Sequence, residues 1–165
     1  MRRSIPYFAM ALIAGLLTGC SSSNGPSSRD TRPAEVIGHE AHEAFVDAIN
    51  SNDLDTFLSS VTDDVVFMPP HGPRLVGRAE VAPWAAGYLD AYSIHWTKTT
   101  LEFVVSGDWA FEQYSYESAD TPRDGGGEVV RDRGKGIAIF RREADGVWRV
   151  ARDAWNSDLP ASTGN

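Results

Sequence analysis

The stretch DGVWRVARDAWNSD, residues 145–158, carries much of the information about the fold. Asp145 and Gly146 favour a tight turn, and the β-branched and aromatic residues that follow predict a last strand over 147–155, entered through a hairpin. Side chains alternate between the two faces of a strand. One face should carry Arg149, Ala151, Asp153 and Trp155, and the other Trp148, Val150, Arg152 and Ala154. A carboxylate therefore shares a face with a tryptophan.

Further strands are predicted upstream of this hairpin. The β-rich runs are 94–105, 109–118 and 129–142, separated by a turn at 106–108 and a glycine-rich polar loop at 120–127. The mixed charges at 131–135 are typical of a solvated strand edge. A shorter β-type run at 64–68 is stopped by two prolines. The second half of the domain is thus predicted to be mainly sheet.

Helices are predicted in the first half. Apolar residues recur at helical spacing over 34–50, and Asn52 and Asp53 are suited to cap a second, short helix that contains Leu54 and Phe57. A third helix is predicted over 78–92, after Gly77. Helices followed by hairpin-linked strands indicate the α+β class with an antiparallel sheet.

The N-terminus resembles a bacterial lipoprotein signal. Arg2 and Arg3 precede an apolar run that is too short to span a membrane, and Thr18-Gly19 leads directly to Cys20, which is the only cysteine. The resemblance implies removal of residues 1–19 and lipidation of Cys20. A polar tether over 20–33, a domain over 34–158 and a disordered tail over 159–165 are expected to follow. The expected location is the outer membrane, facing the periplasm.

Composition narrows the possible partners. The chain has a net charge of −8, which becomes −10 without Arg2 and Arg3. An acidic domain repels phosphate backbones and anionic headgroups, so no nucleic acid is expected as a partner, and membrane attachment is expected through the lipid alone. No cofactor is expected. With Cys20 lipidated, no thiol is left for a disulfide or a cysteine metal site.

Several motifs in the same order resemble the nuclear transport factor 2-like superfamily, in its SnoaL-like and ketosteroid-isomerase-like bacterial branch. They are Asn52-Asp53-Leu54-Asp55, Thr62-Asp63-Asp64-Val65-Val66-Phe67, Gly77-Arg78-Ala79-Glu80-Val81, Ser106-Gly107-Asp108-Trp109-Ala110 and the stretches 145–151 and 153–158. The resemblance implies a curved sheet wrapped into a cone, with the N-terminal helices closing a central apolar pocket. By the same register it implies that the pocket is lined by Phe45, Phe67, Trp84, Tyr88, Phe111, Gln113, Asp153 and Trp155.

The resemblance does not carry over the steroid isomerase mechanism. That mechanism uses a carboxylate base and an oxyanion hole formed by a tyrosine and a protonated acid. By the resemblance, the base position falls here on Pro69, the tyrosine position on Phe45 and the acid position on Ala138. None of these side chains transfers a proton. We therefore expect a protein that is not a steroid isomerase of this kind.

Two other residues are candidates for chemistry. Asp153, facing an apolar cone, should have a raised pKa and could act as an acid or base, or it could fix the pocket by accepting hydrogen bonds. His71 lies on a loop expected near the pocket mouth. His39 and His42 have a spacing that can chelate a metal, but the neighbouring glutamates indicate a solvated face, so no metal site is expected.

The other face of the sheet is expected to be apolar as well. Strand parity places Tyr114, Tyr116, Ile137, Ile139, Trp148 and Val150 on the convex side. An extended apolar patch on a sheet face that would otherwise meet water usually indicates a partner. Since family members commonly dimerise through this surface, a homodimer is expected.

Three functions are compatible with these features. The first is an envelope-anchored module that binds a small apolar or amphipathic molecule in the cone. The second is a SnoaL-like enzyme that performs proton transfer, cyclisation or hydrolysis with Asp153. The third is a dimeric interaction domain with a filled pocket. A second polar group beside Asp153 would favour the enzyme, because acid–base chemistry normally needs a convergent pair.

Overall fold

The computed structural model describes residues 30–160. The predicted signal peptide, Cys20, most of the tether and the end of the tail lie outside the described residues. The elements, in chain order, are α1 (Ala34–Asn50), α2 (Leu54–Ser59), β1 (Val61–Met68), β2 (Leu75–Val76), α3 (Arg78–Ala91), β3 (Tyr92–Ser93), β4 (Trp96–Ser106), β5 (Trp109–Pro122), β6 (Val130–Arg142) and β7 (Trp148–Ser157).

The three helices form where the periodicity predicts them. α1 has the predicted bounds and buries one apolar face that includes Ile37, Ala41 and Phe45. α2 begins at a cap in which the Asp53 carboxylate accepts a hydrogen bond from the Thr56 amide at 2.8 Å, which satisfies one of the free N–H groups of the first turn. None of the helices within residues 30–160 has the length and apolar character needed to cross a membrane.

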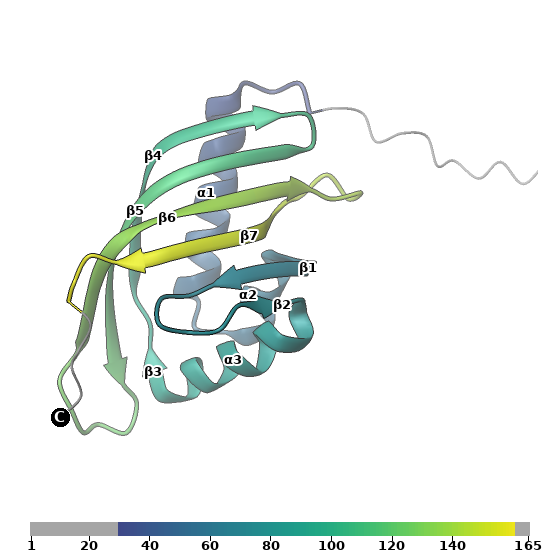
Figure 1. The fold of residues 1–165 in the computed structure, drawn as a ribbon. Helices are drawn as coiled ribbons and strands as arrows, with labels where there is room; N and C mark the ends of the chain where they lie inside the picture. Colours follow the sequence, from purple (N-terminus) through teal and green to yellow (C-terminus); the bar gives the residue numbers. More distant parts are fainter. Residues whose placement is uncertain (1–29, 161–165) are drawn as a thin grey trace, which may run out of the picture.

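The strands form one strongly curved sheet. Its order is β2-β1-β7-β6-β5-β3, with β4 also paired to β5 along the same edge as β3. Neighbouring strands are antiparallel except β1 and β7, which run parallel. Figure 1 shows the sheet curling around α1, which lies behind it, while α3 crosses the lower opening. The α+β cone with N-terminal helices is confirmed.

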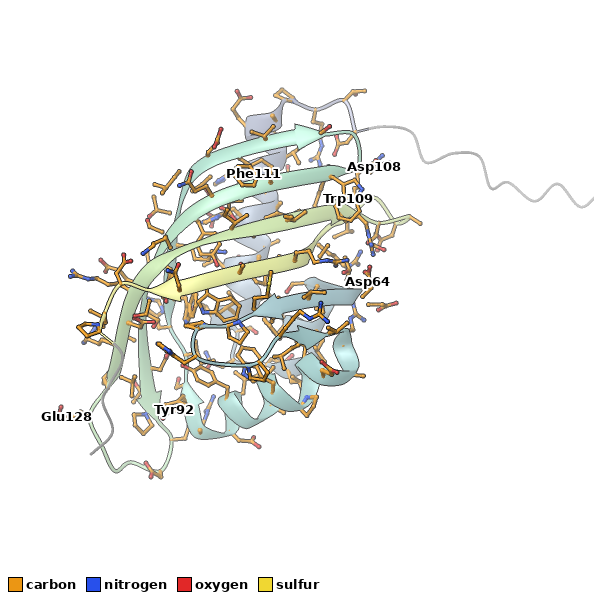
Figure 2. All side chains as sticks on the ribbon, viewed as in Figure 1. Asp64, Tyr92, Asp108, Trp109, Phe111 and Glu128 are labelled. Carbon is orange, nitrogen blue, oxygen red and sulfur yellow. The ribbon has the colours of Figure 1, made fainter. Side chains whose placement is uncertain are left out.

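The face that each β5 residue presents differs from the prediction. Even-numbered residues are buried against the helices, among them Glu112, Tyr114 and Tyr116, whereas Phe111 is half-buried and Gln113 is exposed on the convex face. Figure 2 labels Phe111 on β5, in a view in which α1 lies behind the sheet. The prediction that Phe111 and Gln113 point inward was therefore wrong. A shift of one residue moves every side chain to the opposite face.

A β-bulge changes the alternation on β7. Val150 pairs with Phe140 and Arg152 pairs with the adjacent Ile139, so Ala151 is an extra residue without a partner on β6. Val150 before the bulge and Asp153 after it are consequently both buried inside the cone. The predicted convex patch is reduced by these corrections. Four of its members face the interior instead, namely Tyr114, Tyr116, Trp148 and Val150.

Two glycines of β6 allow tyrosine rings to lie directly on the sheet. A Cβ atom on Gly136 would lie 2.8 Å from the Ala154 carbonyl oxygen and would collide with the Tyr114 hydroxyl. A Cβ on Gly134 would collide with the Asn156 carbonyl oxygen and would lie 2.9 Å from a ring carbon of Tyr116. Both glycines are needed for close approach, because the space that a side chain would take is already occupied.

The first prediction concerns this contact. Gly136→Ala should lower the free energy of unfolding by about 1–3 kcal/mol, because the added methyl group overpacks the interior and displaces the Tyr114 ring. The measurement is urea denaturation followed by circular dichroism. Gly87→Ala is the matched control: Gly87 lies within α3 with no neighbour within 4 Å of its Cβ position, so the helix should gain up to about 1 kcal/mol. Equal effects of the two changes would contradict the packing argument.

Candidate ligand-binding site

A cavity of about 70 Å³ lies inside the cone, and seven of its twelve lining residues are aromatic. The aromatic residues are Phe45, Phe57, Phe67, Trp84, Tyr88, Trp96 and Trp155, and the others are Ile49, Ala85, Leu89, Ile94 and Asp153. They come from α1, α2, β1, α3, β4 and β7, with Ile94 from the link between β3 and β4. The cavity therefore forms only when helices and sheet are packed together.

The aromatic rings around the cavity support one another. Trp155 lies edge-on to Phe67, with ring centroids 5.8 Å apart, and it makes a second edge contact with Trp84 at 6.3 Å. Trp84 in turn stacks on Tyr88 one helical turn later. Edge-to-face and offset-stacked pairs are the favoured arrangements of aromatic rings. The wall is thus a set of rings fixed by mutual contact.

Asp153 is the one carboxylate among the lining residues of the described chain. Its side chain is buried, and its Oδ1 accepts a hydrogen bond from the Tyr114 hydroxyl at 2.8 Å. Burial raises the pKa of Asp153 to about 6, although the positive charge of Lys98 and the hydrogen bond from Tyr114 act in the opposite direction. The group is therefore poised to change its protonation between mildly acidic and neutral pH.

Behind this carboxylate lies the ammonium group of Lys98. The Lys98 side chain is 1% exposed, and its Nζ lies 3.6 Å from the ring centroid of Tyr114 and 4.7 Å from that of Phe45. Both ring faces attract the cation. Burial lowers the pKa of Lys98, while the negative charges of Asp153 and Glu112 partly offset this effect.

Glu112 completes the buried cluster. Its Oε2 lies 3.8 Å from Lys98 Nζ, and its Oε1 accepts a hydrogen bond from Thr100 Oγ1 at 2.6 Å and lies 2.6 Å from His42 Nδ1. Burial acts to raise the pKa of Glu112, but the hydrogen bonds from His42 and Thr100 and the charge of Lys98 together hold it below its usual value. We call His42, Lys98, Thr100, Glu112, Tyr114 and Asp153 the buried polar cluster.

Six of the eight residues proposed for the pocket lie at the cavity: Phe45, Phe67, Trp84, Tyr88, Asp153 and Trp155. Phe111 and Gln113 lie on the convex face, for the reason of register given above. His71 is exposed in the loop between β1 and β2 and has a positive φ of 56°. It is not among the cavity-lining residues.

The two helical histidines have different environments. His39 is exposed, whereas His42 is buried against Glu112, so the prediction that both lie on a solvated face was wrong for His42. The β5 carboxylate draws His42 inward as a hydrogen-bond partner. Within residues 30–160, no cluster of three or more histidine, cysteine, aspartate or glutamate side chains has the geometry to hold a metal ion.

Lys98 and Glu112, two buried charged residues beside the cavity, were not predicted from the sequence. One signal was present for Lys98. Trp96, Lys98 and Thr100 alternate along a strand and share one face, so a tryptophan that faces the pocket places the lysine beside it. Glu112 gives no comparable local signal, because its partners are 12 to 70 residues away in the chain.

The fold agrees with the comparisons to known proteins. The family model of the SnoaL-like domain matches residues 42–151, and the chain therefore belongs to the SnoaL-like family. Its cone is of the nuclear transport factor 2-like type, which commonly serves as a ligand-binding or enzymatic domain. No curated protein matches the sequence significantly.

Solved structures of three bacterial proteins are similar to this chain over nearly their whole length. A ketosteroid isomerase-like protein from Erwinia carotovora atroseptica is 27% identical, with a TM-score of 0.69, over 79% of this chain and 99% of that one. A conserved protein from Planctomyces limnophilus is 28% identical, with a TM-score of 0.67, over 74% and 96% of the two chains. A putative dehydratase of the NTF2-like family from Streptomyces avermitilis is 26% identical, with a TM-score of 0.65, over 77% and 96%.

A second prediction follows from the raised pKa of Asp153. The folded protein holds the Asp153 proton up to about pH 6, against an ordinary pKa of 3.8, so stability should fall as the pH rises from about 4 to 6 and stay reduced above that range. The difference between a pKa of 3.8 and one of about 6 corresponds to about 3 kcal/mol in the free energy of unfolding. Asp153→Asn, which keeps an acceptor for Tyr114, should therefore be more stable than the wild type at pH 7 by up to about 3 kcal/mol, and not at pH 4.

The measurement is the free energy of unfolding in urea at a series of pH values. Asp47→Asn, on the exposed side of α1, is the matched control and should retain the loss of stability that Asp153 causes between about pH 4 and 6. An Asp153→Asn variant that is less stable than the wild type at pH 7 would show that the carboxylate is held in place by favourable interactions that outweigh its burial.

Proposed function

We propose that the domain binds a small, mainly apolar molecule inside the cone, with one polar group of the ligand on Asp153. The observation that carries this proposal is a cavity walled by seven aromatic residues with a single carboxylate. Binding sites for small molecules are typically apolar cavities with a few well-placed polar groups that orient the ligand. The presence of open space also argues against a purely structural domain with a filled pocket.

The size of the cavity favours a compact ligand. A site for one water molecule needs about 10–15 Å³, so a cavity of about 70 Å³ has room for a few such groups. A cavity of about 150 Å³ holds benzene, so a molecule with one ring is the largest ligand that this space could admit, with some movement of the lining side chains, and a fused-ring steroid is too large. The residues at the steroid isomerase positions also argue against steroid isomerase chemistry. Phe45 lines the cavity and Ala138 is fully buried, and neither side chain can donate a proton.

Acid–base catalysis by Asp153 is the second candidate, favoured by a pKa of about 6 at the cavity wall. A second polar group does lie beside Asp153, the Tyr114 hydroxyl at 2.8 Å, but Tyr114 is not among the cavity-lining residues. Tyr88 is the other cavity-lining residue with a titratable side chain, and its hydroxyl donates a hydrogen bond to Asp120 at 2.6 Å. This hydroxyl is thus already engaged away from Asp153, and we rank binding first.

The third prediction tests occupancy of the cavity with benzyl alcohol, a single ring with one hydrogen-bond donor. Isothermal titration calorimetry should detect its binding to the wild type. Ala85→Leu should abolish binding, because Ala85 lines the cavity and the larger side chain fills it. Ala91→Leu, at the exposed end of the same helix, should bind as the wild type does. Equal binding to both variants would place the ligand elsewhere and refute the proposal.

We further propose that the domain is anchored to the cell envelope through a lipid on Cys20, in the outer membrane and facing the periplasm. The fourth prediction is that Cys20→Ser abolishes detergent-phase partitioning of the protein expressed in a bacterium, because the acyl chains would supply the membrane affinity. Metabolic labelling with an alkyne fatty acid should mark the wild type only. Unchanged partitioning of Cys20→Ser would refute the anchor.

A homodimer through the convex face is proposed on a revised set of residues. Val104, Phe111 and Ile139 are neighbours across three strands, and Ile137 and Met68 flank Ala154 in the next row. Val104, Ile137 and Met68 are 47%, 45% and 42% exposed. Adjacent apolar side chains that meet water commonly mark a protein interface.

The fifth prediction is that Ile137→Asp converts the dimer to a folded monomer, since a charge at the centre of the apolar rows opposes their burial. Size-exclusion chromatography with light scattering measures the mass. Thr99→Asp, at an exposed polar position of β4, should leave the dimer intact. A wild-type protein that is monomeric at all concentrations would end this proposal.

A further inference from the structure

Asp153 is a buried carboxylate without an ion-pair partner. Among the described residues, its hydrogen-bond donor is the neutral hydroxyl of Tyr114, and no lysine, arginine or histidine nitrogen lies within 4 Å of its carboxylate. Its side chain is nonetheless buried at 5% exposure and lines the cavity. Buried charges in proteins are normally paired, because an isolated ion loses its hydration without compensation.

The ammonium that acts on Asp153 is shared with a second carboxylate. Lys98 is the ammonium nearest to Asp153 in the cluster, and it forms its ion pair with Glu112 at 3.8 Å. The carboxylates of Asp153 and Glu112 thus share the Lys98 ammonium. His42 and Thr100 lie within hydrogen-bond distance of Glu112. The charge of Lys98 also acts on Asp153, from beyond 4 Å, and it lowers the pKa of that carboxyl. The negative charge that faces the cavity is therefore compensated only in part, by a cation that also pairs with Glu112.

The aromatic wall of the cavity can also attract a positive charge. Four of the lining residues are the tryptophans Trp84, Trp96 and Trp155 and the tyrosine Tyr88, whose ring faces carry partial negative charge. Rings of this kind attract a cation within about 6 Å of their centroids, and tryptophan does so most strongly. The same interaction is already used within the cone, where Lys98 lies over the rings of Tyr114 and Phe45.

We propose that the ligand of the cone is a small organic cation, an amine whose positive group lies on Asp153 while its apolar part fills the aromatic cavity. This inference rests on the proposed binding function and specifies its ligand class. The ammonium donates a hydrogen bond to the Asp153 oxygen that Tyr114 does not occupy, and it adds a counter-charge on the cavity side of the carboxylate. The net charge of −8 over the whole chain also favours the approach of a cation.

The test compares three probes of similar size that differ in charge: benzylammonium, benzyl alcohol and benzoate. Calorimetric titration of the wild type at pH 7 should show benzylammonium binding about tenfold or more tightly than benzyl alcohol, with no binding of benzoate. In Asp153→Asn, which keeps the shape of the site and the acceptor for Tyr114, the preference for the cation over the alcohol should disappear. Retained binding of benzyl alcohol by this variant reports that the cavity is intact.

A second measurement uses the wild type alone. Binding of benzylammonium should weaken as the pH is lowered through about 6, while binding of benzyl alcohol stays constant. Alcohol and cation binding equally well, or the alcohol binding better, would overturn the inference and leave the proposed binding function standing. Failure of all three probes to bind the wild type would overturn both.

Discussion

The ion pair between Lys98 and Glu112 constrains the rest of the domain. Both groups lose their hydration on folding, and only a cluster of correctly placed partners compensates for that loss. The partners come from different elements: His42 from α1, Thr100 from β4, and the rings of Phe45 and Tyr114 from α1 and β5. Helix α1 has to lie at one depth and in one rotation against the sheet for these contacts to form. Breaking a buried pair of this kind by removing one partner typically costs about 3–5 kcal/mol.

The cluster also explains why the cavity has a polar end. Tyr114 links the two regions, because its ring lies under the Lys98 ammonium and its hydroxyl binds Asp153. Position and charge of the cavity carboxylate are therefore set from behind by residues that do not line the cavity. A ligand meets one oxygen of Asp153 against a background already fixed by folding, which limits the reorganisation needed for binding.

The sequence was sufficient to predict the helices and the fold class but not the face that each strand residue presents. α1 follows from apolar periodicity and α2 from the Asp53 cap, both of which are local signals. On β5 the alternation places Glu112 inside and Phe111 outside, the reverse of what hydrophobicity favours. A buried glutamate at this position needs its partners His42, Lys98 and Thr100, which lie on other elements and are distant in the sequence. On β7 the extra residue Ala151 lets both Val150 and Asp153 face inward, and such a bulge has no clear signature in one sequence.

The glycines at 134 and 136 have a consequence for how this sequence can change over time. Gly136 and Tyr114 occupy one shared volume, so position 136 is not free to vary while the tyrosine is present, whereas at Gly134 the Asn156 carbonyl oxygen blocks a side chain even before Tyr116 does. A larger residue on β6 becomes acceptable only after the facing tyrosine has been replaced by something smaller. Relatives that have lost Tyr114 should therefore be those in which position 136 has diversified. In such lineages the carboxylate at position 153 would have lost the hydrogen bond from Tyr114. The residue at position 153, and with it the ligand of the cone, could then have changed as well.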